Sequence, residues 1–246
     1  MTHPLEGRIA LVTGGTRGIG RSISEKLLEA QATVVICARS EADVRRAVEE
    51  MAAGSAPERV TGRACDVGRY EDVAALFRFI RQRFARLDIL VNNAGVGLFQ
   101  PVDRMTPQDW RRVIETNLSG VFYCTREAVP LMREQGAGDI INIGSLAGKN
   151  AMAGGAAYNA SKFGLIGLSE ASMLDLRYDN IRVSYVMPGS VATEFAGPSG
   201  ALAGRDEEWK ISPGDIAETV LHILQLPART LASRVEIRPT RPPRKN

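Results

Sequence analysis

The stretch RIALVTGGTRGIG, at residues 8–20, decides the fold. Its first six residues form an apolar run rich in β-branched side chains, which predicts a buried strand. The glycine-rich turn that follows leads into a segment with Ile23, Leu27 and Leu28 at helical spacing. Glycine permits a sharp turn and a close approach of the backbone to a ligand, and a helix that begins there directs its N–H groups at an anion. The stretch therefore predicts a strand, a phosphate-binding loop and a helix.

The same alternation of short apolar runs and helical segments continues along the chain without a break. The predicted strands cover 8–13, 33–38, 59–64, 88–93, 139–145, 181–187 and 233–238, and the predicted helices cover 18–30, 41–53, 70–85, 107–134, 157–178 and 213–225. Strands without polar alternation, separated by helices, are typical of a parallel sheet that is covered on both faces. Right-handed crossovers wind such a sheet in two directions. We therefore expect a doubly wound α/β fold in a single domain over 1–246.

Length, composition and charge limit the classes of protein to be considered. The chain has 246 residues, of which 44% are hydrophobic and 24% charged, as in globular proteins with a substantial core. No apolar run approaches the ~18 residues of a membrane span, and the start lacks the pattern of a cleavable signal peptide. We therefore expect a cytoplasmic protein with no membrane partner.

The net charge of +3 is spread along the chain, apart from the basic end RPTRPPRKN. Nucleic acid is therefore not expected as a partner. The three prolines of this end predict an extended tail over 239–246, either solvated or laid along a partner subunit.

Histidine and cysteine are too scarce for several kinds of site. The histidines are His3 and His222 alone, so neither a Ser-His-Asp triad nor an HExxH metal site is expected. The three cysteines, Cys37, Cys65 and Cys124, lack CxxC spacing, which argues against a disulfide framework or a zinc site. We predict no metal site.

Tyr158 and Lys162 lie four residues apart in the sequence YNASK, a spacing that places both side chains on one helix face. An ammonium beside a phenol lowers the phenol pKa from its ordinary value of about 10 toward neutrality. Tyr158 is therefore the candidate proton donor to a carbonyl, or acceptor from an alcohol. Ser145, at the end of strand 139–145, is the candidate hydrogen-bond donor to the substrate oxygen.

The end of strand 33–38 bears on which dinucleotide would bind. A chain selective for NAD places an acidic residue at this strand tip, against the ribose 2′-hydroxyl. Here Arg39 follows the strand, and Arg17 lies in the glycine loop. A guanidinium favours a 2′-phosphate, so we predict NADP(H) over NAD(H). The alternative is that Arg39 caps a solvent-facing corner, with Glu41 and Asp43 nearby.

Three motifs resemble those of the short-chain dehydrogenase/reductase family: TGGTRGIG at 13–20, NNAG at 92–95 and YNASK at 158–162. The resemblance covers residues 6–238. It implies a Rossmann-type, seven-stranded parallel sheet in three α/β/α layers, and usually a homodimer or homotetramer built on the helices around 107–134 and 157–178.

The family resemblance also implies which residues form the site. Catalysis would use Asn117, Ser145, Tyr158 and Lys162, with Asn117 holding a water that links the lysine to solvent. Asp66 would lie near the adenine amino group, although a helix cap is the alternative for this residue. The residues implied to bind the cofactor are Gly14, Thr16, Arg17, Gly18, Ile19, Gly20, Arg39, Asp66, Val67, Asn93, Ala94, Gly95, Tyr158, Lys162, Pro188, Gly189, Val191 and Thr193.

The expected activity is NADP(H)-dependent interconversion of a small-molecule carbonyl and its alcohol. The body of the chain resembles the 3-oxoacyl-carrier-protein reductases, but the ending PARTLASRVEIRPTRPP is more similar to the branch that acts on 3-hydroxy acids and small carbonyls. Phe195 and Trp209 either line the substrate pocket or pack. Two alternatives from other classes are a non-catalytic dinucleotide-sensing protein of the same fold and a basic interaction module.

Overall fold

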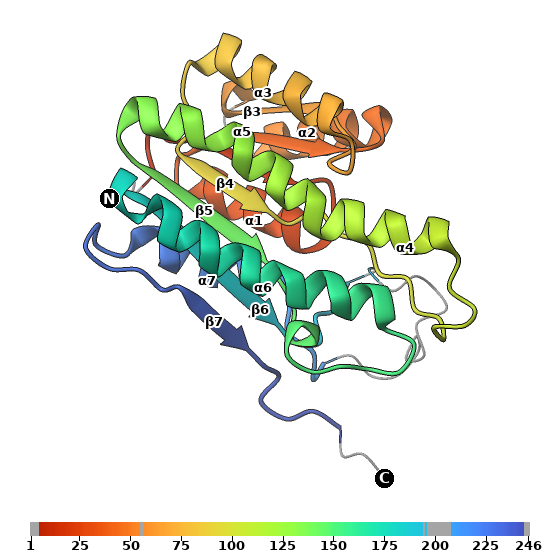
Figure 1. Cartoon of the computed structure of the whole chain (residues 1–246). Helices are drawn as coiled ribbons and strands as arrows, with labels where there is room; N and C mark the ends of the chain where they lie inside the picture. Colours follow the sequence, from red (N-terminus) through yellow and green to blue (C-terminus); the bar gives the residue numbers. More distant parts are fainter. Residues whose placement is uncertain (1–4, 55–56, 194, 196–207, 244–246) are drawn as a thin grey trace.

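The computed structural model describes residues 5–54, 57–193, 195 and 208–243. One sheet of seven parallel strands runs through the molecule in the order β3-β2-β1-β4-β5-β6-β7 (Figure 1). The strands are β1 (Ile9–Thr13), β2 (Thr33–Ala38), β3 (Val60–Ala64), β4 (Ile89–Asn92), β5 (Gly138–Ile143), β6 (Ile181–Pro188) and β7 (Arg234–Ile237). The chain winds outward from β1 in one direction and from β4 in the other, which confirms the predicted doubly wound sheet.

Helices cover both faces of the sheet, as predicted. They are α1 (Gly18–Glu29), α2 (Glu41–Gly54), α3 (Tyr70–Phe84), α4 (Pro107–Ile114), α5 (Gly120–Gln135), α6 (Ala156–Leu176) and α7 (Pro213–Gln225). Successive strand residues point to opposite faces. Ala10 and Val12 therefore pack with α1, α2 and α7 in one core, while Ile9 and Leu11 pack with α3 and α5 in another.

Side-chain caps set the starts of two helices. Thr106 precedes α4, and its hydroxyl accepts a hydrogen bond from the backbone N–H of Asp109 at 3.0 Å. Ser212 and Asp215 form a capping box at the start of α7, with Pro213 in its first turn. Ser-Pro in the sequence therefore marks the beginning of a helix, as expected.

The helix predicted over 107–134 is present as one uninterrupted helical run from Pro107 to Gln135, but it is not α-helical throughout. A π-helical turn at Glu115–Ser119, which contains Asn117, lies between α4 and α5. Such turns insert one extra residue into a helix and are frequent at functional sites. The expected strand 139–145 also ends early, since β5 stops at Ile143. Ser145 instead begins the short 3₁₀ helix Leu146–Gly148.

The described residues include no helix that is long and apolar enough to cross a membrane. Within the same residues, no group of His, Cys, Asp and Glu side chains is arranged to hold a metal ion. The three cysteines are buried and unpaired. Of the predicted tail, residues 239–243 contain no helix or strand, and 244–246 lie outside the described residues.

Candidate active site

The predicted site residues gather at the carboxyl-terminal edge of the sheet, where parallel α/β sheets bind their ligands. Each group of predicted cofactor residues follows a different strand. The loops carry Gly14, Thr16, Arg17, Gly18, Ile19 and Gly20 after β1, Arg39 after β2, Asp66 and Val67 after β3, Asn93, Ala94 and Gly95 after β4, and Pro188, Gly189, Val191 and Thr193 at and after β6. Since β1 and β4 are neighbours, the glycine loop lies at the point where the winding direction reverses.

The glycine loop is held in shape by the NNAG segment. The Asn93 side chain donates from Nδ2 to the carbonyl oxygens of Thr13 at 3.0 Å and Gly14 at 3.2 Å. The Thr13 hydroxyl accepts from the backbone N–H groups of Asn93 and Ala94, each at 3.0 Å. A Cβ atom on Gly20 would lie 2.3 Å from the Gly14 carbonyl oxygen, so only glycine fits there. Sequence reasoning missed Thr13, although a hydroxyl between a buried strand and a glycine loop is a usable signal.

The start of α1 fits a cofactor pyrophosphate. Unlike α4 and α7, α1 has no side-chain cap and no acidic residue in its first turn, so its first N–H groups and positive dipole end can meet an anion. Gly18 has φ +55°, a conformation that other residues rarely adopt. Thr193 approaches this turn, because a Cβ on Gly18 would lie 3.4 Å from the Thr193 Cγ2.

The segment after β6 is anchored before it reaches the glycine loop. Gly189 donates its N–H to the carbonyl oxygen of Ile237 at 2.8 Å, and Val191 forms a bridge with Ile211. These contacts carry the chain from the end of β6 toward Gly18. The part of the predicted substrate segment at 194 and 196–207 lies outside the described residues.

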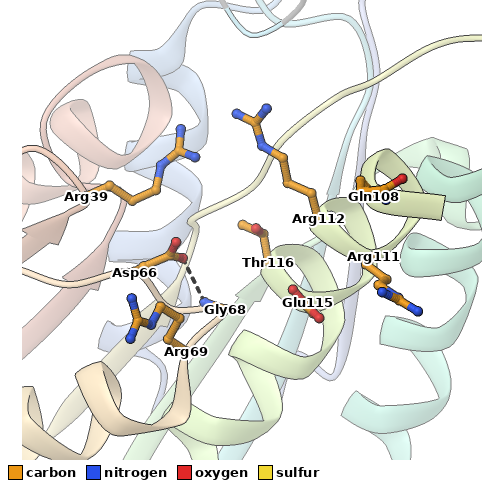
Figure 2. A pocket seen from close by; sticks show the side chains of 9 residues that line it. All are labelled: Arg39, Asp66, Gly68, Arg69, Gln108, Arg111, Arg112, Glu115 and Thr116. Carbon is orange, nitrogen blue, oxygen red and sulfur yellow. Dashed lines mark hydrogen bonds between the residues drawn. The ribbon is translucent and has the colours of Figure 1, made fainter. Parts of the chain in front are cut away.

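A cavity of about 230 Å³ opens between the ends of β2 and β3 and the π turn (Figure 2). Its lining includes Arg39 and Asp66, both predicted for the cofactor, whereas the Val67 side chain is buried in the core. Asp66 does not cap α3. Its Oδ1 accepts from the Gly68 N–H at 3.0 Å within the loop, which leaves the carboxylate beside the cavity.

Arg39 places a positive charge at the tip of β2. Arg39 is exposed and makes no hydrogen bond or ion pair with any of the described residues. The two nearby carboxylates are engaged elsewhere: Glu41 pairs with Arg45 at 3.6 Å, and Asp43 with Arg46 at 2.6 Å. The Arg39 charge is therefore not neutralised by the acidic residues that the sequence places near it.

Tyr158 and Lys162 lie on the same face of α6 and are both buried, with 9% and 5% of their surfaces exposed. The Lys162 Nζ is 5.8 Å from the centre of the Tyr158 ring. It donates a hydrogen bond to the carbonyl oxygen of Ile143, the last residue of β5, at 3.1 Å. The lysine thus joins the tyrosine to the strand that leads into Ser145.

Burial sets the protonation of this pair. Burial raises the pKa of Tyr158 above its ordinary value, and a hydrogen bond with the Ser145 side chain opposes that rise. Burial also lowers the pKa of Lys162 from 10.5 to about 8. The expectation that the Lys162 ammonium pulls the Tyr158 pKa down was therefore wrong: burial is the main cause of the shift, and Lys162 is not among its causes.

Asn117 is buried in the π turn and is fixed by three hydrogen bonds. Its Oδ1 accepts from the Val96 N–H at 2.8 Å, and its Nδ2 donates to the Val96 carbonyl at 2.9 Å and to the Ser161 hydroxyl at 3.2 Å. The side chain makes no direct hydrogen bond to Lys162. Asn117 therefore ties the segment after β4 to α6, and sequence reasoning missed both partners.

A second buried amide network joins the central strands to α6. Asn92 on β4 donates to the Asn142 Oδ1 on β5 at 2.8 Å, and Asn142 donates to the Ser169 hydroxyl at 2.9 Å. Asparagines in otherwise apolar strands are the sequence signal for such a network, since buried polar groups require partners. The network fixes α6, and with it Tyr158, against the sheet.

Two aromatic rings flank Tyr158. The ring of Phe99 lies 5.4 Å from the Tyr158 ring, and that of Phe195 lies 5.7 Å away, measured between centres. Each phenylalanine is 42% exposed. Phe195 therefore packs on the tyrosine and also faces outward, and Phe99 was not singled out from the sequence.

Comparisons with known proteins agree with this architecture. The family model described as short chain dehydrogenase matches residues 8–201. A 3alpha-hydroxysteroid dehydrogenase of Mediterraneibacter gnavus is 33% identical over 78% of this chain and 76% of its own. A crystal structure of a metagenomic short-chain oxidoreductase in complex with NADP is 37% identical, with a TM-score of 0.84 over 97% of this chain and all of its own. The closed form of a serine dehydrogenase complexed with NADP+ is 30% identical, with a TM-score of 0.85 over 93% and 94% of the two chains. The protein belongs to the short-chain dehydrogenase/reductase family of oxidoreductases.

Proposed function

We propose that this protein is an NADP(H)-dependent reductase that interconverts a ketone or aldehyde with its alcohol, with Tyr158 as the general acid and base. One observation carries the proposal: Thr193 and Phe195, two positions apart in the sequence, contact the two halves of the site. Thr193 approaches Gly18 at the start of α1, while Phe195 packs on the Tyr158 ring. These two contacts support a single site that contains both the buried phenol and the glycine loop.

The residues of this site fit a dinucleotide. The start of α1 would hold the pyrophosphate, Asp66 the adenine amino group, and Arg39 with Arg17 the 2′-phosphate. The bound nicotinamide supplies or accepts the hydride. Two structurally similar proteins, a short-chain oxidoreductase and a serine dehydrogenase, are described in complex with NADP and NADP+, which supports the choice of NADP(H) over NAD(H).

The side chains around Tyr158 divide the proton chemistry among them. The raised pKa keeps the phenol protonated near neutral pH, so it can donate its proton to the carbonyl oxygen during reduction. The Ser145 hydroxyl donates a hydrogen bond to the same oxygen. Lys162, with its Nζ 5.8 Å from the centre of the ring, is assigned the place of a positively charged neighbour of the phenol and not that of lowering its pKa. In alcohol oxidation the same residues act in reverse.

The substrate is proposed to be an apolar carbonyl compound or alcohol. Phe99 and Phe195 place an aromatic wall on two sides of Tyr158, and Met152, just before α6, is exposed. Such walls bury carbon skeletons of a substrate and exclude water from the reacting oxygen. The hydroxysteroid dehydrogenase relative is consistent with a ring ketone or ring alcohol as one member of this class.

A carbonyl panel tests this function. Purified protein is mixed with NADPH and ring ketones, aryl ketones, aldehydes, 3-oxoacyl thioesters or 3-oxo acids, and the loss of NADPH absorbance is followed. We expect turnover, fastest with the apolar ketones. Binding of NADPH without turnover of any compound would favour a nucleotide sensor, and failure to bind NADPH would favour the interaction module. Either result would refute the proposed activity.

The partner is proposed to be a second copy of the chain, in a homodimer or homotetramer. Phe122 on α5 and Phe163 and Leu174 on α6 are large apolar residues that are about half exposed. Large exposed apolar side chains on adjoining helices are typical of an association surface. Light scattering should give at least a dimeric mass, and Phe163→Glu should lower it. A monomeric mass for the unmodified protein would contradict this.

A further inference from the structure

Two arginine guanidinium groups stand on opposite walls of the cavity shown in Figure 2. Arg39 reaches it from the loop after β2, and Arg112 reaches it from α4. Both side chains extend toward the same opening, above Asp66 (Figure 2). Neither makes a hydrogen bond or ion pair with the residues that the structure describes, although both side chains line a cavity that also holds two carboxylates. Because two positive side chains repel each other, the placement of Arg39 and Arg112 around one cavity indicates that a ligand binds between them.

The floor of the cavity adds a hydrogen-bond acceptor. Asp66 uses its Oδ1 for the Gly68 N–H, and its Oδ2 has no hydrogen-bond partner among the described residues. A ligand that presents a donor edge to this carboxylate and flat faces to the two walls matches the cavity. Guanidinium groups are planar and stack on aromatic faces. A purine base with an exocyclic amino group has both features.

We propose that Arg112 is a cofactor-binding residue whose guanidinium contacts the face of the adenine base opposite Arg39. The inference rests on the proposed dinucleotide function and adds a residue on α4 to the residues assigned there. The neighbouring residue supplies a matched control. Arg111 also borders the cavity, but its guanidinium points away from Arg39 (Figure 2). The two arginines thus differ in direction and share charge, helix and exposure.

The adenine base is common to NADPH and NADH, whereas the 2′-phosphate belongs to NADPH alone. A contact to the base therefore affects the binding of both nucleotides, and a contact to the phosphate affects NADPH selectively. The variant Arg112→Lys further distinguishes a contact to the base from a contact to the phosphate, because lysine keeps the charge but lacks the planar group that stacks on a base.

The experiment measures the dissociation constants of NADPH and NADH by fluorescence titration for the unmodified protein, Arg112→Ala, Arg112→Lys and Arg111→Ala. We expect Arg112→Ala to weaken both nucleotides by a similar factor of roughly 3 to 10, the range of a partly exposed stacked cation. Arg112→Lys should retain most of that loss. Arg111→Ala should stay within about twofold of the unmodified protein, because its side chain points elsewhere.

Three results would overturn the inference. They are unchanged affinities in Arg112→Ala, a loss confined to NADPH that lysine restores, and an equal loss in Arg111→Ala. Thermal unfolding of each variant shows that the fold is intact, as expected for substitutions of exposed residues. If the unmodified protein bound neither nucleotide, the proposed function itself would fail. If the unmodified protein bound the nucleotides and Arg112→Ala bound them equally well, only the role of Arg112 would be refuted.

Discussion

Replacing Lys162 with methionine should change how the stability of the protein depends on pH. Lys162 is almost fully buried, and the one hydrogen bond of its ammonium to the described residues goes to the neutral carbonyl of Ile143. Burial lowers its pKa from 10.5 to about 8, so keeping this ammonium charged inside the fold costs free energy. Methionine has a similar length and no charge, and therefore removes that cost while largely filling the space.

The magnitude follows from the two pKa values. The Lys162 pKa is about 8 in the folded protein and 10.5 in the unfolded chain. When the lysine is charged in both states, this difference lowers the free energy of unfolding by roughly 3 kcal/mol. Between these pKa values the unfolded chain binds a proton that the folded chain lacks, so the stability of the unmodified protein rises with pH. Between about pH 7 and about pH 9.5 the free energy of unfolding of the unmodified protein therefore increases by about 2 kcal/mol.

Urea denaturation of both proteins at the two pH values measures this difference. We expect the unmodified protein to gain about 2 kcal/mol relative to Lys162→Met between about pH 7 and pH 9.5. Lys26→Met is the control, since ion pairs with Glu218 and Glu29 raise the pKa of Lys26 and leave it charged across that range. Equal pH dependence of unfolding for the unmodified protein and Lys162→Met would refute the burial argument. The argument would also fail if the unmodified protein gained the same stability relative to Lys26→Met as relative to Lys162→Met.

Three further predictions concern the loop, the cofactor and the proton transfer. Gly20→Ala should destabilise the protein by about 2 kcal/mol or more and abolish NADPH binding, since its Cβ would lie 2.3 Å from the Gly14 carbonyl oxygen. Gly167→Ala on α6, where a Cβ meets nothing within 4 Å, should instead stabilise by roughly 0.5–1 kcal/mol in thermal unfolding; similar effects of the two would contradict the packing argument. Arg39→Asp should weaken NADPH binding at least about tenfold and NADH binding clearly less, because NADH lacks the 2′-phosphate, and equal losses in titration would be evidence against a phosphate contact. Because burial raises the pKa of Tyr158, initial rates of carbonyl reduction should fall at alkaline pH while those of alcohol oxidation rise, and the reverse trend would exclude the phenol as the proton donor.

The sequence is sufficient for the sheet because burial on both faces leaves a local signal. The strand predicted over 181–187 is Ile181–Pro188 in the structure, and the one predicted over 233–238 is Arg234–Ile237. The starts of α4 and α7 follow from Thr106 and Ser212 with the prolines after them. Local patterns suffice in these places because the determining contacts are local.

The π turn at Glu115–Ser119 has no comparable local signal. It depends on the two-way hydrogen bonding of Asn117 with Val96 and on the contact with Ser161, residues that are distant in sequence. The direction of Arg112 is likewise visible only once α4 stands opposite the end of β2. Neither feature can be predicted before the tertiary arrangement is known.

The protonation of the Tyr158–Lys162 pair shows a second limit of sequence reasoning. The spacing of four residues fixes that both side chains share a helix face. It does not fix how deeply they are buried, and burial is what determines both pKa directions here. Charge proximity inferred from spacing is therefore a weaker guide to pKa than the surroundings that the fold supplies.

The central claim, that the Tyr158 phenol moves the proton in carbonyl reduction, is tested most directly by Tyr158→Phe. The variant removes one oxygen atom and retains the ring that packs between Phe99 and Phe195. NADPH affinity and single-turnover carbonyl reduction are measured on the same preparation. We predict NADPH affinity within about threefold of the unmodified protein and a loss of reduction of at least about 100-fold, the lower end of general acid catalysis. Reduction at the unmodified rate with intact NADPH binding would contradict the account.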